Sequence, residues 1–457
     1  MSDPPSMNSN RDSSKDPSIG VRVIPVSEHG IRSSAIDESA RRVLRRLQDA
    51  GYLAYVAGGA VRDLLLGRTP KDFDIVTNAR PEEVHHLFRN SRMIGRRFRI
   101  VHVLYGQDFV EVSTFRSRVD PDEVAARHEG HAFRVRDGMV LRDNVYGTPV
   151  EDAWRRDFSV NALFYDSKEE IIIDHVGGLV DLRAGVLRVL GNPEQRIAED
   201  PVRMIRAVRF SASLGFAIES SAQTALTVCA GRLAAASPAR LFDEMQKLFF
   251  CGHADRVMDL LLESRLLDVL FENLATWSRD QDSRIQWLHR VVRQVDIWRQ
   301  AGHAVAPGLF LALLCGPFHE AMAEGNPSSG APDPQALEQA TLEHMRHLSR
   351  RMTVPRVIAF HMARIVSIQP RFQTVPVRRL SRMMGMAVFR DAYIYFKMSV
   401  RFSGRHTDAL AWWEQKLGQG RGPESADRQR ESRTDAESAD APPDSEAILE
   451  STGGSAL

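Results

Sequence analysis

Cysteine pairs, long apolar runs and a leader-like start are all missing from this sequence. Its 457 residues include only three cysteines, which are scattered and form no Cys-x-x-Cys pair. This usage indicates buried thiols in a reducing compartment and argues against a disulfide framework. No apolar run approaches the roughly eighteen residues of a membrane span, and residues 1–18 lack the apolar core of a signal peptide. We therefore expect a cytoplasmic protein with no membrane contact.

A large excess of one charge is missing as well. The formal net charge is +1 at pH 7, which by itself is no signature of a nucleic-acid-binding protein. Residues 419–457 contain four Arg against nine Asp and Glu, so the rest of the chain is modestly basic. At roughly 150 residues per domain, the length predicts about three modules.

Among the residues that are present, the segment 58–67 (GGAVRDLLLG) is the most informative. The apolar run 52–57 before it predicts a buried strand, and the residues from Ala60 onward are typical of a helix. Gly58 and Gly59 would form a tight turn at the start of this helix, because neither has a Cβ atom. The free N–H groups of a helix start favour a bound anion such as a phosphate.

Three charged residues beside this turn are of the types that hold a nucleotide. Arg62, in the first helical turn, would add a bidentate contact to a phosphate oxygen. Asp72 and Asp74 are two residues apart, so on a strand both side chains would point the same way. At ~4 Å two carboxylates repel by about 4 kcal/mol at an effective dielectric near 20, and a divalent cation turns this into attraction. A pair of such ions would activate an attacking hydroxyl and stabilise a leaving pyrophosphate.

A third carboxylate has two candidates. Glu111 interrupts the apolar residues of a predicted strand at 109–116, although a glutamate on a solvated strand face would alternate in the same way. Asp157 lies in the segment 155–163 (RRDFSVNAL), whose paired Arg and following Asn suit phosphate and ribose contacts or a surface ion cluster. The residues alone leave both candidates open.

Six segments, taken in order, resemble the class II nucleotidyltransferases, the family of the CCA-adding enzymes and bacterial poly(A) polymerases. They are GGAVRDLLLG at 58–67, KDFD at 71–74, EVSTFR at 111–116, RRDFSVNAL at 155–163, DHVGGLVDL at 174–182 and EDPVRMIRAVRF at 199–210. The resemblance implies an α+β protein, with a mixed α/β nucleotidyltransferase head followed by an all-helical neck, body and tail. It further implies two catalytic Mg²⁺ ions, with Mn²⁺ as an alternative, and ATP as a substrate.

The resemblance also implies roles for individual residues. Asp72 and Asp74 would hold the metal ions, and Glu111 and Asp157 both match carboxylates that support catalysis in the family. Asp200 and Arg203 would read the edge of the incoming base. The implied nucleotide-binding residues are Gly58, Gly59, Arg62, Arg156, Asp200, Arg203 and Arg206.

A plainer alternative exists for the segment 196–214, which predicts one continuous helix. Glu199 and Arg203 are spaced i,i+4, and Asp200 and Arg203 are spaced i,i+3. Such pairs are common on solvated helices and contribute only about 0.2–0.5 kcal/mol each.

Two further segments favour the poly(A) polymerase branch of the family. GRRFRIVHV at 95–103 and PARLFDE at 238–244 match that branch better than the CCA-adding enzymes. We therefore expect template-independent addition of AMP from ATP to RNA 3′ ends, which promotes RNA turnover. The first alternative is a CCA-adding tRNA nucleotidyltransferase, which also uses CTP and stops when CCA is complete. The second is a non-catalytic RNA-binding protein with the same fold.

Composition divides the chain into five predicted parts. They are a disordered start (1–20), the catalytic head (35–183), a helical neck that binds nucleotide and RNA (186–250), a helical RNA-binding region (251–416) and a disordered acidic tail (417–457). Within the head, residues 117–147 predict a long loop beside the active site. We expect a monomer whose partners are RNA 3′ ends and ATP, with RNA-degradation or RNA-chaperone proteins as further candidates.

Basic and aromatic residues outside the six segments each allow two interpretations. Arg92 and its neighbouring arginines could lie along an RNA backbone or merely flank a strand, and His102 nearby is predicted to be structural. Trp412 and Trp413 could stack on bases or close a helical core. The acidic tail departs from the strongly basic tails of many relatives, which puts tail-assisted capture of RNA in doubt.

Overall fold

The computed structural model describes most of the chain between residues 20 and 419. The described ranges are 20–95, 99–117, 133–136, 139–143, 145–324 and 334–419. Of the two segments predicted to be disordered, residues 1–19 and 420–457 lie outside these ranges. The chain forms two compact units, Met1–Met322 with Gln339–Ala363, and Ala323–Glu338 with Arg364–Leu457.

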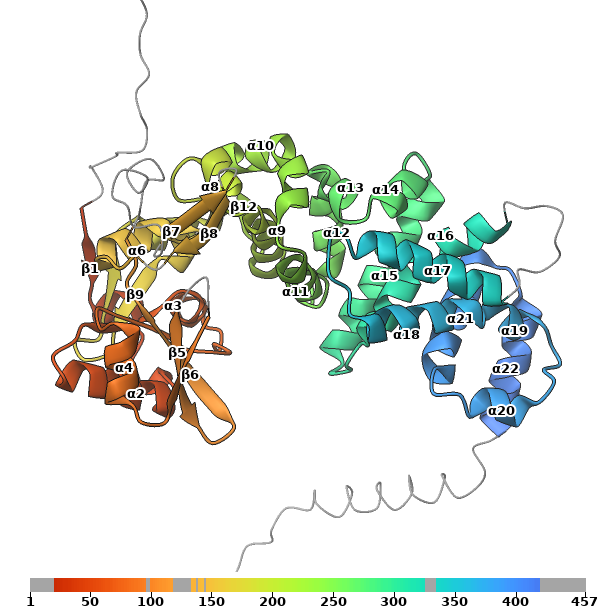
Figure 1. Ribbon diagram of the computed structural model, residues 1–457, viewed down its shortest axis with the longest axis horizontal. Coiled ribbons are helices and arrows are strands. Elements are labelled where there is room, and N and C mark those ends of the chain that lie inside the picture. The colour runs from red at the N-terminus through yellow and green to blue at the C-terminus, as the bar shows by residue number, and fades with distance from the viewer. Residues whose placement is uncertain are drawn as a thin grey trace, which may run out of the picture. The chain divides into compact units, whose positions relative to one another are not determined.

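An eight-stranded mixed sheet organises the first part of the chain (Figure 1). In spatial order its strands are β1 (Arg22–Ile24), β10 (Ile171–Asp174), β9 (Leu163–Asp166), β2 (Ala54–Ala57), β3 (Asp74–Thr77), β6 (Asp108–Thr114), β5 (Ile100–Tyr105) and β4 (Ser91–Ile94). These neighbours are antiparallel except for β3 and β6, which run parallel. The predicted strand at 52–57 is confirmed as β2.

One face of the sheet is covered by two helices. α2 (Glu38–Asp49) packs on β2, β3 and β6, and α4 (Pro81–Leu87) packs on β4, β5 and β6. Val101, Val103, Val110 and Val112 point into this layer and are buried. The side chains that alternate with them lie on the opposite face, which we call the open face because these side chains are half-buried or exposed.

Short elements beside β2 and β9 contain several of the segments that resemble the nucleotidyltransferase family. They are α3 (Gly59–Leu65), α6 (Pro149–Arg155), the 3₁₀ turn η2 (Ser159–Asn161) and α7 (Gly178–Ala184). Asp174 caps α7 by accepting hydrogen bonds from the backbone N–H groups of the residues that begin it. Gly178 is required sterically, because a Cβ atom there would lie 2.2 Å from the carbonyl oxygen of Ser159.

Helices make up nearly all of the described chain from Pro193 onward. They are α8 (Pro193–Glu199), α9 (Val202–Leu214), α10 (Ser220–Val228), α11 (Pro238–Phe249), α12 (Ala254–Glu263), α13 (Leu266–Leu270), α14 (Glu272–Ser278), α15 (Asp282–Gln300), α16 (Pro307–Glu324), α17 (Pro334–Leu348), α18 (Arg356–Ser367), α19 (Gln369–Gln373), α20 (Leu380–Met384), α21 (Phe389–Ser403) and α22 (Thr407–Gln419). The predicted α+β class, with a mixed head and a helical remainder, is confirmed.

Two local predictions were wrong. The single helix predicted at 196–214 is broken between α8 and α9, because Asp200, which precedes Pro201, adopts an extended conformation. The loop predicted at 117–147 contains a hairpin of β7 (Phe133–Arg136) and β8 (Met139–Asp143), whose strands pair antiparallel. The rest of that loop, except its ends at 117 and 145–147, lies outside the described residues.

The second unit has its own aromatic core. Trp413 is fully buried, and its ring lies 4.9 Å from that of Phe372, whose carbonyl accepts a hydrogen bond from the indole. Of the two interpretations of the tryptophans, the core interpretation therefore holds for Trp413. Across the described ranges, no helix is both long and apolar enough to span a membrane. The cytoplasmic location stays a prediction.

Candidate active site

Strands β3 and β6 bring two of the predicted carboxylates together. Ile75 pairs with Val112 in this parallel ladder, so the preceding residues Asp74 and Glu111 are neighbours across the two strands. Paired residues project to the same side of a sheet, and for Glu111 that side is the open face. A long-range strand pairing thus places side by side two carboxylates that are far apart in the sequence.

Asp72 joins these two from outside the strand. β3 begins at Asp74, which pairs with Ala57, and β2 ends there because the chain turns at Gly58. Asp72 therefore has no ladder partner, and the prediction that both aspartates lie on one strand was wrong for it. Asp72 still interacts electrostatically with both Asp74 and Glu111. We call Asp72, Asp74 and Glu111 the carboxylate trio.

The carboxylate trio is short of positive partners. Desolvation and the negative charge of Asp74 raise the pKa of Glu111 to about 7, with a smaller contribution from Asp72. Desolvation and Asp72 also raise the pKa of Asp74, against the opposing charge of Arg156. Within the described ranges, the carboxylates of Asp72 and Asp74 accept no hydrogen bond and form no ion pair. Such a site gains free energy when it takes up positive charge.

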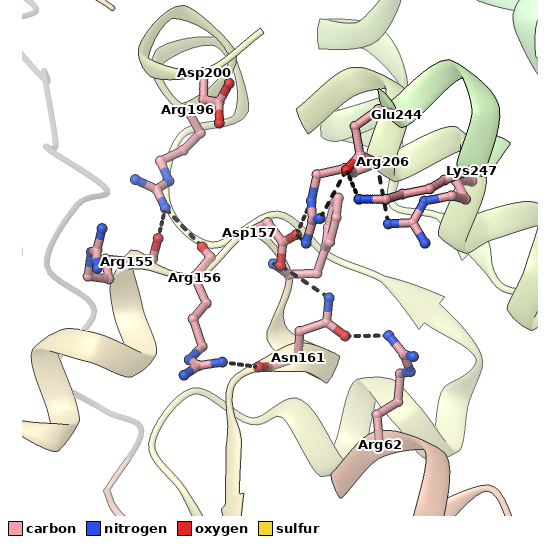
Figure 2. Close-up of polar contacts among 12 residues, drawn as sticks. Arg62, Arg155, Arg156, Asp157, Asn161, Arg196, Asp200, Arg206, Glu244 and Lys247 are labelled. Atoms are coloured by element: carbon pink, nitrogen blue, oxygen red, sulfur yellow. Dashed lines mark hydrogen bonds and ion pairs between the residues drawn. The ribbon is translucent and has the colours of Figure 1, made fainter. Parts of the chain in front are cut away.

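Asp157 has the opposite environment (Figure 2). Arg206 of α9 donates two hydrogen bonds to its Oδ2, at 2.8 and 2.5 Å, and Asn161 donates one to its Oδ1 at 3.1 Å. Burial works against the ionised form, but the charge of Arg206 and these hydrogen bonds outweigh it and hold the pKa of Asp157 at about 2. Its charge is already neutralised by the protein.

A chain of hydrogen bonds continues from Asp157 to Arg62. The amide oxygen of Asn161 accepts a hydrogen bond of 2.7 Å from Nη1 of Arg62, while its nitrogen donates to Asp157. A carboxylate can only accept here and a guanidinium can only donate, so the amide orientation is fixed. We call Arg206, Asp157, Asn161 and Arg62 the Asp157 network. It connects the helix α9 to the helix that follows Gly58.

Positive charge gathers around one buried ring at the end of this network. The guanidinium carbons of Arg62, Arg206 and Arg209 lie 4.9, 5.3 and 4.3 Å from the centroid of Phe210. Cations stack favourably on aromatic faces, so the ring holds the three groups near one another despite their like charge. The region is suited to an anion.

Glu244 of α11 anchors the far side of the same cluster (Figure 2). Its carboxylate lies 3.9 Å from Arg206, 3.5 Å from Arg209 and 3.2 Å from Lys247. Glu244 is buried, so its ion pairs fix the orientation of the arginines. Glu244 ends the segment 238–244, and no local pattern in that segment predicts its contact with the arginines.

Arg156 and Gly58 meet at the turn before α3. Arg156 donates to Asp152 at 3.2 and 3.0 Å and to the carbonyl of Asn161 at 3.3 Å. Gly58 is left-handed, with φ of 72°, and a Cβ atom there would lie 3.1 Å from Arg156 Nη1. A side chain at Gly58 would thus be both strained and crowded. The predicted turn at the start of α3, with Gly58 before Gly59, is confirmed.

The residues predicted to read the base lie at the break between α8 and α9. Asp200 accepts two hydrogen bonds from Arg240, at 3.0 and 2.9 Å. Arg203 forms the predicted pair with Glu199 at 3.0 Å and also donates to the carbonyl of Arg196. Arg240 was not predicted, because its partner Asp200 lies 40 residues away and no local pattern in the sequence connects the two.

Known proteins are similar to most of this chain. "Poly(A) polymerase I" of Escherichia coli O6:H1 is 37% identical over 404 residues, which cover 86% of this chain and 85% of the relative. The chain belongs to the bacterial poly(A) polymerase family. The enzyme of the same name from Haemophilus influenzae is 35% identical over 398 residues, covering 86% of this chain and 87% of the relative. The poly(A) polymerase branch predicted from 95–103 and 238–244 is confirmed.

Three models of poly(A) polymerase segments match in order. They are "Poly A polymerase head domain" at residues 54–188, "Probable RNA and SrmB- binding site of polymerase A" at 215–278 and "Polymerase A arginine-rich C-terminus" at 329–445. The chain is accordingly a nucleotidyltransferase that binds nucleotide and RNA.

CCA-adding enzymes are similar to a smaller part of this chain. The one from Leuconostoc mesenteroides is 36% identical over 264 residues, covering 56% of this chain and 62% of the relative. Among solved structures, a tRNA nucleotidyltransferase complexed with a primer tRNA and an incoming ATP analogue covers 83% of this chain and all of its own, with a TM-score of 0.58. Its sequence identity is 21%, so the likeness concerns the fold.

Proposed function

We propose that the carboxylate trio carries the adenylyl transfer of this poly(A) polymerase. In this reaction the 3′-hydroxyl of an RNA attacks the α-phosphate of ATP, the bond to the β-phosphate breaks and pyrophosphate leaves. The observation that carries the proposal is the pairing of Asp74 with Glu111 on one face, beside Asp72. Glu111 rather than Asp157 is then the third catalytic carboxylate, because the charge of Asp157 is already taken by Arg206.

Asp72 and Asp74 fit a divalent metal ion as a pair, and a bound triphosphate would have to supply further oxygen ligands, because the described residues contain no group of three His, Cys, Asp or Glu side chains placed to hold one. The donor atoms of the two aspartates are carboxylate oxygens, which Mg²⁺ prefers and Mn²⁺ accepts. A cation relieves the mutual repulsion of the trio, and Asp72 and Asp74 have no hydrogen-bond or ion-pair partner among the described residues. Asp72 and Asp74 would hold the ions, which when bound promote deprotonation of the hydroxyl and neutralise the leaving pyrophosphate.

Arginines on the β2 and β9 side of the carboxylate trio are suited to bind the triphosphate. Arg62 and Arg206 are both fixed by the Asp157 network, and Arg156 interacts electrostatically with Asp74. Preorganised guanidinium groups stabilise developing phosphate charge without reorganising during the reaction. Gly58 and Gly59 would let the phosphates approach the backbone. Asp157 is in this proposal a positioning residue.

Base recognition is proposed for Asp200 and Arg203, as the resemblance implies. A carboxylate and a guanidinium together offer acceptors and donors to the edge of a purine. Arg240 holds Asp200 in place through two hydrogen bonds and would therefore define the position of the reading edge. RNA-degradation or RNA-chaperone proteins are proposed as further partners.

Extension of end-labelled RNA tests the proposed function. The RNA is incubated with Mg²⁺ and each nucleoside triphosphate separately, with wild-type protein, Asp72→Ala, and Asp108→Ala as a control. Asp108 is an exposed aspartate at the start of β6, outside the carboxylate trio. We expect long ladders with ATP alone, abolished in Asp72→Ala and kept in Asp108→Ala. Dependence on CTP, with a stop after CCA is complete, would support a CCA-adding activity instead.

A further inference from the structure

The open face carries an exposed aromatic ring next to the carboxylate trio. Phe109 lies two residues before Glu111 on β6, so both side chains project from the same face, about 7 Å apart along the strand. Phe109 is 52% exposed, whereas Val110 between the two is buried. A large apolar ring in this position does not serve the core.

His102 of β5 holds this ring in a defined orientation. The two rings stack with centroids 3.9 Å apart and planes only 8° from parallel. His102 is also the direct cross-strand partner of Glu111, and its Nε2 lies 3.6 Å from the glutamate oxygen Oε2. The outer face of Phe109 is thereby presented flat beside a catalytic carboxylate, and the conformational entropy of the ring is already reduced.

A cation completes the row on the next strand. Arg92 of β4 is exposed and pairs directly with His102, so its side chain also projects from the open face. Across β6, β5 and β4 the open face therefore presents Glu111, then His102 with the ring of Phe109 stacked on it, and then Arg92. Aromatic rings beside basic groups are the usual elements of a site for single-stranded nucleic acid.

The order of the strands indicates which substrate lies beside these side chains of the open face. The arginines suited to the triphosphate come from α3, the end of α6 and α9, on the β2 and β9 side of the carboxylate trio. In phosphoryl transfer the attacking and leaving oxygens are roughly in line, on opposite sides of the phosphorus. If the pyrophosphate leaves toward the arginines, the RNA 3′ end approaches from the β6 and β5 side, where Phe109 lies.

We propose that Phe109, held flat by His102, is a stacking platform for a base in the last two nucleotides of the RNA 3′ end. In this proposal Arg92 contacts a backbone phosphate of the same RNA. The proposal rests on the proposed function, because it takes the carboxylate trio as the point where the 3′-hydroxyl is held. It assigns a specific part of the RNA to Phe109 and Arg92, which lie outside the segments that carry the family resemblance.

A fluorescent base analogue reports the stacking without any reaction. Short RNAs carry 2-aminopurine, whose fluorescence falls on stacking, at the last or the penultimate position, and they are titrated with protein in the absence of ATP and metal. The proteins are wild type, Phe109→Ala, Phe109→Leu and Phe109→Tyr. Leu53→Ala is the matched control, because Leu53 is 45% exposed and precedes β2, at the end of that strand away from Asp74.

We expect quenching at one of the two positions in wild type, Phe109→Tyr and Leu53→Ala, and its loss in both Phe109→Ala and Phe109→Leu. Leucine keeps apolar bulk without a ring face, so it separates stacking from general packing. With ATP present, Phe109→Ala should raise the KM for RNA about tenfold and leave the KM for ATP unchanged. Thermal unfolding confirms that each variant is folded.

Two results would overturn the proposal. Equal quenching in wild type and Phe109→Ala would show that the ring contacts no base at the 3′ end. A raised KM for ATP with an unchanged KM for RNA would assign the ring to the incoming nucleotide. Failure of the proposed function would be recognised by a different result: the wild-type protein itself would not extend RNA with ATP, whatever the fluorescence shows.

Discussion

The carboxylate trio and the Asp157 network use the same kind of side chain in opposite ways. The pKa of Glu111 is raised to about 7, while that of Asp157 is lowered to about 2. Asp157 has two hydrogen bonds from a guanidinium and one from an amide, and Asp74 has none from any described residue. The carboxylate trio is therefore suited to bind a cation, whereas the charge of Asp157 is already neutralised by Arg206.

This difference teaches how to separate chemistry from support within one set of motifs. A residue whose charge is satisfied by the protein contributes to the stability and alignment of its neighbours. A residue whose charge is unsatisfied costs stability, and that cost is tolerated where a ligand relieves it. The two groups should therefore respond differently to the same substitution of a carboxylate by an amide.

The largest effect is expected for Asp74→Asn. Loss of a proposed metal-binding carboxylate should lower kcat for AMP addition by at least about a thousandfold, which is roughly 4 kcal/mol. The free energy of unfolding should stay the same or rise slightly, because one of several mutually repelling charges is removed. Single-turnover extension and urea unfolding measure the two quantities. Asp108→Asn, on the neighbouring strand, is the matched control and should change neither.

Asp157→Asn should act on stability first. It leaves Arg206 without its main counter-charge, and breaking a largely buried ion pair costs about 3 kcal/mol of unfolding free energy. In a double-mutant cycle with Arg206→Gln, the two losses should be strongly non-additive. Full stability combined with the activity loss of Asp74→Asn would instead make Asp157 a catalytic carboxylate, and the comparison between the two groups would collapse.

Asn161→Ala interrupts the Asp157 network without removing a charge. Arg62 would lose the 2.7 Å hydrogen bond that orients it, and a hydrogen bond to a charged group contributes about 2 kcal/mol. We expect the KM for ATP to rise about thirtyfold, with the KM for RNA unchanged. The control is Asn78→Ala, because Asn78 bonds the backbone of Leu53 at the other end of β2. An effect on RNA alone would contradict the assignment of Arg62.

The last prediction concerns stability alone, in a buried pair of histidines that stays neutral in the folded protein. His319 and His344 share a hydrogen bond of 2.7 Å, and burial lowers their pKa values to about 3 and about 4. In the unfolded chain both bind protons near pH 6.5, so the unfolded state holds more protons below that pH. Stability is therefore full above about pH 6.5 and falls toward pH 4, by about 1.4 kcal/mol per pH unit for each histidine.

Urea unfolding between pH 7 and 5 measures this slope. It should be reduced in His319→Gln and unchanged in His303→Gln, where the histidine is exposed. Equal slopes in all three proteins would show that the pair does not stay neutral in the folded protein.

The sequence predicted the local parts of the site and missed the long-range ones. Gly58 and Gly59 were placed correctly, because a strand, a turn and a helix follow one another within a few residues, and Arg62 lies on that helix, in its last turn instead of its first. Glu111 was found by resemblance, and alternation along β6 placed it on the face opposite Val110 and Val112. These features depend on neighbours in the chain, which a pattern can show.

Other features depend on partners that no local pattern contains. Arg240 reaches Asp200 from 40 residues away, and Glu244 meets Arg206 only once α11 has packed on α9. The break at Pro201 did have a signal, since proline disfavours helix at the preceding residue, but the apolar spacing of 196–214 hid it. Asp72 lies outside β3 because its would-be partner strand has already turned at Gly58.

The parallel pairing of β3 with β6 also makes the site a test of correct folding. A slip of one residue in this ladder would turn Glu111 toward the layer covered by α2 and α4 and turn a valine outward. Such a molecule would lose a proposed catalytic group and bury an unpaired charge in the same event. A mispaired chain would therefore be unstable as well as inactive, and quality control by proteolysis would remove the molecules that cannot work.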